Sequence, residues 1–106
     1  MNKGGDMIME IMTEGKLCIR KEVRITELAI YTYKLILNTK LRYSSFGLAL
    51  YSVEISMESV INGSTSEAKS GELFADEKKA LLFFDKLVRN LATPIDLAYI
   101  IEDEFT

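Results

Sequence analysis

The chain has 106 residues, a formal net charge of -3 and a hydrophobic fraction of 48%. That length fits one domain with a single core, and that composition is typical of a folded globular protein rather than a disordered one. No apolar run approaches the roughly 20 residues of a membrane-spanning helix, and the start shows no signal-peptide pattern. The single cysteine, Cys18, allows no disulfide within the chain. We therefore expect one cytoplasmic domain over residues 1–106.

The charges are unevenly distributed along the chain. Residues 16–43 carry seven basic and two acidic side chains, whereas residues 44–106 carry five basic and eleven acidic ones. Opposite charges of this kind usually balance one another within a fold or between copies of it. They can also form a patch for an anionic partner.

Residues 1–6 allow two interpretations. Back-translation of Lys-Gly-Gly-Asp at 3–6 can give a bacterial ribosome-binding site just upstream of Met7 and Met9, which would make residues 1–6 a mis-called start. The alternative is a flexible, glycine-containing N-terminus, with flexibility extending over residues 1–15.

Three segments predict strands. Residues 16–25 alternate imperfectly, with Lys21 as the exception among the apolar positions. Residues 27–38 are rich in β-branched and aromatic side chains, and residues 46–58 alternate most clearly. Residues 7–12 fit a strand or a short helix equally well.

Asn62 and Gly63 predict a tight hairpin turn. Asn-Gly favours a type I′ turn, in which both central residues have positive φ. The return strand would lie within residues 64–74, whose serine, lysine and glutamate side chains suit an exposed edge.

Two helices are predicted at the C-terminus. Asp76 can cap the first helix. Thr93 can cap the second, with Pro94 at its first position and Asp96 placed to complete a capping box. The apolar stripe of the first helix is Ala80, Phe83, Phe84, Leu87, Val88 and Leu91. The apolar face of the second helix is Leu97, Ala98, Ile101 and Phe105.

These elements predict an α+β fold, in which an antiparallel sheet of three or four strands is followed by two C-terminal helices packed on one face. We expect the helices to meet the apolar face of residues 46–57. The helical residues expected in that contact are Phe83, Phe84, Leu87, Val88, Leu97 and Ile101.

The chain lacks the side chains that most catalytic and metal sites use. It has no histidine and one cysteine, which excludes a Ser-His-Asp triad, a Cys-His pair and an ordinary zinc site within one chain. The standard glycine-rich phosphate loops are also missing. Acidic residues 102–104 would point about 100° apart on a helix and would not converge. We therefore predict no catalytic residue, no cofactor and no metal site.

Both faces of the predicted sheet carry apolar side chains. The two helices can cover one face, which leaves the other for a second copy or for another protein. The predicted interaction surface is Ile30, Ile36, Leu48 and Leu50. We therefore predict a non-catalytic protein-binding or regulatory module that can self-associate.

Two other functions stay open. The basic, tyrosine-bearing segment 16–43 could stack bases and hold phosphates, although the acidic total charge disfavours nucleic acid. That patch would comprise Tyr31, Tyr33, Lys34, Lys40, Arg42 and Tyr43. An enzyme would need a carboxylate-based site, using residues such as Glu54 or Glu58, at a dimer interface.

Four short motifs occur in order within residues 28–106. They are Phe-Gly at 46–47, Leu-Val-Arg-Asn at 87–90, Thr-Pro at 93–94 and Asp-Glu-Phe at 103–105. With these motifs the chain resembles a family of short clostridial and related Firmicute proteins of unknown function. The resemblance implies the fold described above and a bacterial cytoplasm, and it implies no activity. Residues 1–27 lie outside it.

Overall fold

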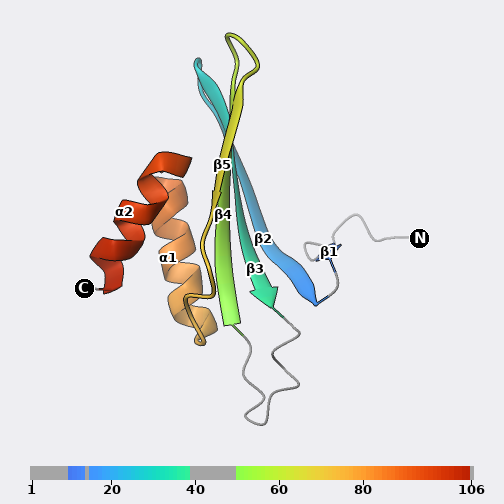
Figure 1. Cartoon of the computed structure of the whole chain (residues 1–106), viewed down its shortest axis with the longest axis vertical. Helices are drawn as coiled ribbons and strands as arrows, with labels where there is room; N and C mark the ends of the chain where they lie inside the picture. Colours follow the sequence, from blue (N-terminus) through green and yellow to red (C-terminus); the bar gives the residue numbers. More distant parts are fainter. Residues whose placement is uncertain (1–9, 14, 39–49, 106) are drawn as a thin grey trace.

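The computed structural model describes residues 10–13, 15–38 and 50–105. It shows an α+β fold, with an antiparallel sheet in the order β1-β2-β3-β4-β5 and two C-terminal helices on one face (Figure 1). The elements are β1 (Glu10–Thr13), β2 (Lys16–Ile25), β3 (Ala29–Asn38), β4 (Leu50–Ser59), β5 (Thr65–Lys69), α1 (Glu77–Arg89) and α2 (Pro94–Phe105). The predicted fold class is confirmed: the four expected strands are β2 to β5, and β1 is a short addition. No helix in the described part of the chain has the length and apolar character needed to cross a membrane.

β2 begins and ends as predicted, but its side chains do not alternate regularly between the two faces of the sheet along the whole strand. A β-bulge between Cys18 and Arg20 shifts the register against β3. Ile19, in the bulge, packs against the core below the helices. Beyond the bulge, Lys21 and Ile25 both lie on the face away from the helices, since Ile25 pairs there with β3. Lys21 is therefore no exception, because after the bulge Lys21, Val23 and Ile25 all lie on the face away from the helices.

The turn between β4 and β5 is wider than the predicted type I′ turn, and that prediction is wrong. A type I′ turn needs positive φ at both Asn62 and Gly63, whereas only Gly63 has it, at 74°. Ser59 holds a loop of residues 60–63 instead. Its carbonyl accepts the N–H of Gly63 at 2.9 Å, and its hydroxyl accepts the N–H groups of Ile61 and Asn62 at 3.2 and 3.4 Å. The loop therefore carries two aliphatic residues at its apex.

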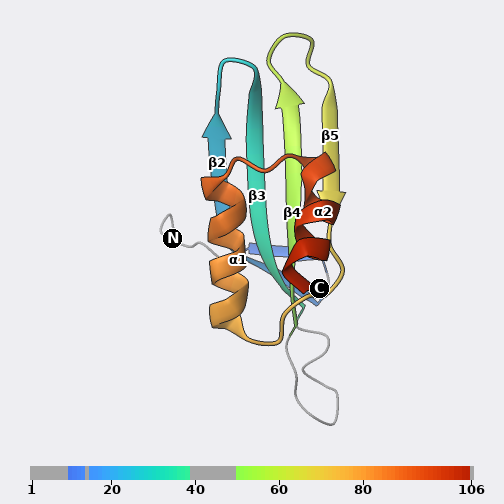
Figure 2. The same ribbon diagram turned by 90° about the vertical axis from the view of Figure 1, so that its left-hand side faces the viewer.

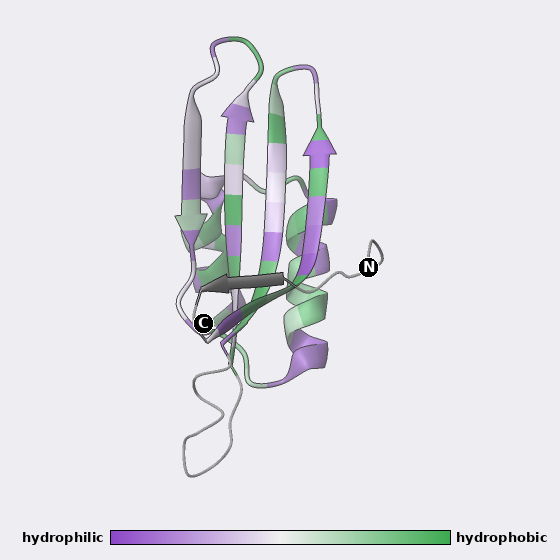
Figure 3. Cartoon of the chain, turned by 90° about the vertical axis from the view of Figure 1, so that its right-hand side faces the viewer, coloured by the Kyte–Doolittle hydropathy of each residue, from purple (hydrophilic) through white to green (hydrophobic). Residues whose placement is uncertain are grey.

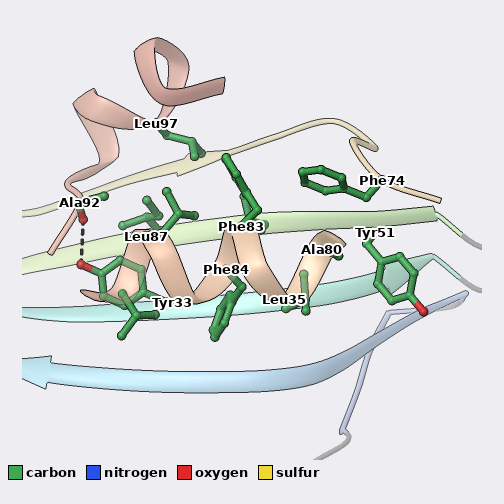
Figure 4. Close-up of a cluster of buried hydrophobic side chains, with 13 residues drawn as sticks. Tyr33, Leu35, Tyr51, Phe74, Ala80, Phe83, Phe84, Leu87, Ala92 and Leu97 are labelled. Atoms are coloured by element: carbon green, nitrogen blue, oxygen red, sulfur yellow. Dashed lines mark hydrogen bonds between the residues drawn. The ribbon is translucent and has the colours of Figure 1, made fainter. Parts of the chain in front are cut away.

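The core lies between the helices and the central strands (Figure 4). α1 packs over β3 and β4, and α2 packs over β5 and β4. The buried cluster is Tyr33, Leu35, Tyr51, Val53, Ile55, Phe74, Ala80, Phe83, Phe84, Leu87, Val88, Ala92 and Leu97. The predicted contact between the helical stripe and the apolar face of β4 is confirmed for residues 51–55. Leu91 and Ile101 are only partly covered.

Both predicted helix starts are confirmed. At the start of α1, the Asp76 carboxylate accepts the backbone N–H of Lys78 at 3.0 Å. At the start of α2, Thr93 and Asp96 form a capping box. The Asp96 carboxylate accepts the N–H of Thr93 at 3.0 Å, and the Thr93 hydroxyl accepts the N–H of Asp96 at 3.3 Å.

α1 ends in a Schellman motif that contains no glycine. Leu91 has a φ of 53°, its N–H bonds to the carbonyl of Val88 at 3.1 Å, and the N–H of Ala92 bonds to the carbonyl of Leu87 at 3.0 Å. A left-handed conformation costs a residue with a Cβ about 1–2 kcal/mol, so neighbouring contacts must hold it. One such contact is the Tyr33 hydroxyl, which donates to the carbonyl of Ala92 at 2.8 Å (Figure 4).

We expect Tyr33→Phe to lower the free energy of unfolding by about 1–2 kcal/mol near neutral pH, because the buried carbonyl of Ala92 loses its donor. Burial, reinforced by the neighbouring Tyr31, raises the pKa of Tyr33 to about 12. The unfolded chain therefore releases this proton first, and the wild type should lose stability as pH rises from about 10 towards 12. Urea unfolding across this range checks both effects. The variant should lose less stability over the same window, and parallel losses would contradict the assignment.

The face by which α2 packs gives a second prediction. Leu97 is 2% exposed whereas Ala98 is exposed, so the predicted apolar face of α2 is wrong at Ala98. Leu97→Ala should lower the free energy of unfolding by about 2–4 kcal/mol. The control Ala98→Ser should change it by less than about 0.5 kcal/mol. Similar losses in the two variants, measured by urea unfolding, would show that α2 packs by another face.

Candidate interaction surface

The predicted interaction surface is not a single open patch. Ile36 is 1% exposed within the chain, so it offers no surface to a partner. The prediction that Ile36 belongs to the interaction surface is therefore wrong. Figure 1 gives the reason, because β1 and the first half of β2 lie on that side of the sheet. Ile30 and Leu50 are half-buried, and Leu48 lies outside the described residues.

The remainder of the face away from the helices, which is turned to the viewer in Figure 3, carries mostly polar side chains on β3, β4 and β5, among them Thr32, Ser56 and Glu67. One row across the strands aligns Lys21, Lys34, Glu54 and Lys69. A shallow hollow of about 130 Å³ lies beside Lys34 and Glu54, and Glu58 is exposed further along β4. Within residues 10–13, 15–38 and 50–105, no group of three histidine, cysteine or acidic side chains could hold a metal ion.

The predicted base-stacking patch is divided between the two faces of the sheet. Tyr31 and Tyr33 lie under the helices, whereas Lys34 lies on the opposite face. Tyr33 is 0% exposed, so its ring cannot stack on a base. The other three predicted residues, Lys40, Arg42 and Tyr43, lie outside the described part of the chain.

An apolar cluster that the sequence patterns did not reveal lies at the far end of the sheet. We call it the hairpin tip, and it consists of Ile25, Leu28, Val60 and Ile61. The four side chains are 54–77% exposed. Ile25 ends β2, Leu28 lies in the β2–β3 turn, and Val60 and Ile61 lie in the β4–β5 turn. Both turns project past the helices (Figure 1). The N–H of Val60 donates to the carbonyl of Leu28 at 2.9 Å and joins the two turns.

The turns of the hairpin tip carry negative charge. Within residues 25–30 and 58–65, the only charged side chains are Glu27 and Glu58, and both are exposed. Arg24, directly before Ile25, is exposed and pairs with Glu22 at 3.1 Å. The β2–β3 turn is held by Thr26, whose hydroxyl accepts the N–H groups of Leu28 and Ala29 at 3.2 and 3.1 Å. The tip therefore presents aliphatic side chains and carboxylates together on a braced backbone.

A groove of about 800 Å³ runs between α1 and α2. The helices lie side by side over the sheet, and each packs mainly on the sheet rather than on the other (Figure 2). The floor is aromatic, because the ring of Phe74 lies 5.3 Å from the rings of both Phe83 and Phe105. Leu82, 66% exposed, and Phe105, half exposed, leave apolar surface open along the groove.

The α1 edge of the groove is cationic. Lys79, Lys86 and Arg89 line it from one side of the helix. Lys86 donates to Glu104 of α2 at 3.3 Å, across the groove. In the described part of the chain, no acidic side chain pairs with Lys79 or Arg89. Asp76 also lines the groove, at the start of α1. The groove thus combines an apolar floor with three cations and two carboxylates, and two of the cations are available to a bound acidic group.

Comparison with known proteins places the chain in a family. A family model, described as a family of unknown function (DUF6514), matches residues 12–106. The chain belongs to this family. The DUF6514 match begins at residue 12, whereas the resemblance found in the sequence begins at residue 28. Both point to a family of unknown function. No curated protein and no solved structure matches the chain.

Proposed function

We propose that this DUF6514 chain is a non-catalytic protein-binding module. Its docking site is the groove between α1 and α2, and its ligand is an apolar protein segment flanked by acidic residues. The observation that carries the proposal is the position of Lys79 and Arg89 beside the aromatic floor. Apolar contacts with the exposed Leu82 and Phe105 would supply most of the affinity, and the two cations would select the partner.

The shape of the groove favours a protein segment over a small molecule. Small ligands are usually held in concave pockets that enclose most of their surface, whereas this groove leaves Leu82 and Phe105 exposed. Exposed apolar surface of this kind is typical of protein interaction sites. The stretch of α1 from Lys79 to Arg89 is about 15 Å long at 1.5 Å per residue, which suits a short peptide segment.

The nucleic-acid alternative loses support. A stacking platform needs exposed rings beside cations, whereas Tyr33 is buried and Tyr31 lies on the face opposite to Lys34. The carboxylate-enzyme alternative gains none, because Glu54 lies in a shallow, exposed hollow and the described carboxylates do not converge.

Selection of peptides on the full chain tests the proposed function. A random library of peptides, each about 16 residues long and so able to cross the groove, is displayed and selected against the wild type. We expect the enriched sequences to combine aliphatic or aromatic residues with Asp or Glu. Binding of the synthetic peptides, followed by fluorescence anisotropy, should weaken at least about tenfold in Lys79→Glu/Arg89→Glu and fall as salt is added.

A matched control separates the groove from total charge. Lys69→Glu/Lys78→Glu makes the same change in net charge at exposed lysines that do not line the groove, so it should bind as the wild type does. Leu82→Asp should abolish binding by placing a charge on the apolar wall of the groove. Any of three results would overturn the proposal: the enriched peptides lack acidic residues, the peptides bind the groove variant as tightly as the wild type, or no peptide is enriched.

A further inference from the structure

We infer that the segment held in the groove is the hairpin tip of a second copy of this chain, so that the protein associates with itself. The inference rests on the proposed function, because it requires the groove to accept a protein segment. It adds the identity of that segment, which is the aliphatic tip flanked by Glu27 and Glu58.

The two surfaces are complementary in apolar character. The tip is a projecting cluster of four aliphatic side chains, each more than half exposed. The groove is a hollow with an aromatic floor and an exposed Leu82 on its wall. Docking the tip in the groove would remove both exposed apolar surfaces from water in one contact.

The two surfaces are also complementary in charge. The tip carries Glu27 and Glu58, and the groove carries Lys79 and Arg89 without acidic partners in the described part of the chain. Contact between two tips would bring carboxylates together, and contact between two grooves would bring together two linings that each carry three cations against two carboxylates. Contact of a tip with a groove instead places Glu27 and Glu58 beside the two cations that have no acidic partner among the described residues.

The contact must form between molecules rather than within one. Phe74, on the groove floor, bridges to Tyr51 near the start of β4, whereas Ser59 at the other end of β4 begins the tip turn. Ser59 lies eight positions after Tyr51 along the strand, and at about 3.3 Å per position this distance is roughly 26 Å. A tip therefore reaches the groove of another copy, either once in a head-to-tail contact or twice in a two-fold dimer in which each copy inserts its tip into the groove of the other. The head-to-tail form builds a ring or an open chain, whereas the two-fold form stops at a dimer.

A charge-exchange experiment tests the inference. Sedimentation velocity of the wild type at low salt should show association that grows with concentration up to about 1 mM, as expected of a small interface. The tip variant Glu27→Lys/Glu58→Lys should sediment as a monomer, and so should the groove variant Lys79→Glu/Arg89→Glu. An equal mixture of the two variants should associate again, because the tip of each then faces a groove of opposite charge in the other.

Two further variants complete the design. Leu28→Ser/Ile61→Ser should abolish association in the wild-type background and in the mixture, because the apolar contact is removed while the charges remain. Lys69→Glu/Lys78→Glu should associate as the wild type does. Circular dichroism and thermal unfolding confirm that each variant is folded.

The outcomes separate the two proposals. A wild type that remains monomeric up to about 1 mM, or association that persists in both charge variants, overturns the self-association. If the groove still binds the selected acidic peptides in that case, the proposed function stands and its partner is another protein. A mixture of the two charge variants that stays monomeric while the wild type associates also overturns the tip-in-groove contact.

Discussion

The hydrogen bond from the Tyr33 hydroxyl to the carbonyl of Ala92 joins a central strand of the sheet to the turn between the helices. It lies beside the left-handed Leu91, which closes α1, and just before the capping box that starts α2. The turn thus fixes where α1 ends and where α2 begins. Because each helix is then held mainly by the sheet, the space between the helices is left unfilled and becomes the groove. The site we propose therefore depends on a contact made between residues 59 positions apart.

The hairpin tip, in contrast, depends on contacts between residues that are close in sequence. Ser59 and Thr26 each use a hydroxyl to accept backbone N–H groups of a turn, and the wider loop at Ser59 carries Val60 and Ile61 outward. The charges of Glu27 and of the groove cations are opposite to the net charges of the chain segments to which they belong. Glu27 belongs to the basic segment of the chain, and Lys79 and Arg89 belong to the acidic one. Local charge at the tip and the groove, rather than the segment totals, would decide what each binds.

Sequence patterns predicted the features that short-range contacts control. The caps at Asp76 and Thr93 involve residues two or three positions apart, so residue type and spacing were sufficient. The apolar stripe of α1 was likewise predictable, because a helix must bury one side. The predictions that failed involve competition between contacts. The hydroxyl of Ser59 overrides the turn preference of Asn-Gly, and the bulge after Cys18 changes which side of β2 faces the helices.

The sequence by itself determined the fold class, the four main strands, both helix starts and most of the core, because periodicity and capping are local properties of the chain. Only the tertiary structure decided which apolar residues remain exposed. Ile36 lies in the same strand as Ile30, yet only Ile36 is fully buried, because the chain folds back over that part of the sheet. The tip and the groove each gather residues from segments that are distant in sequence. Whether those residues form a surface depends on strand register and helix placement, which are set by long-range packing.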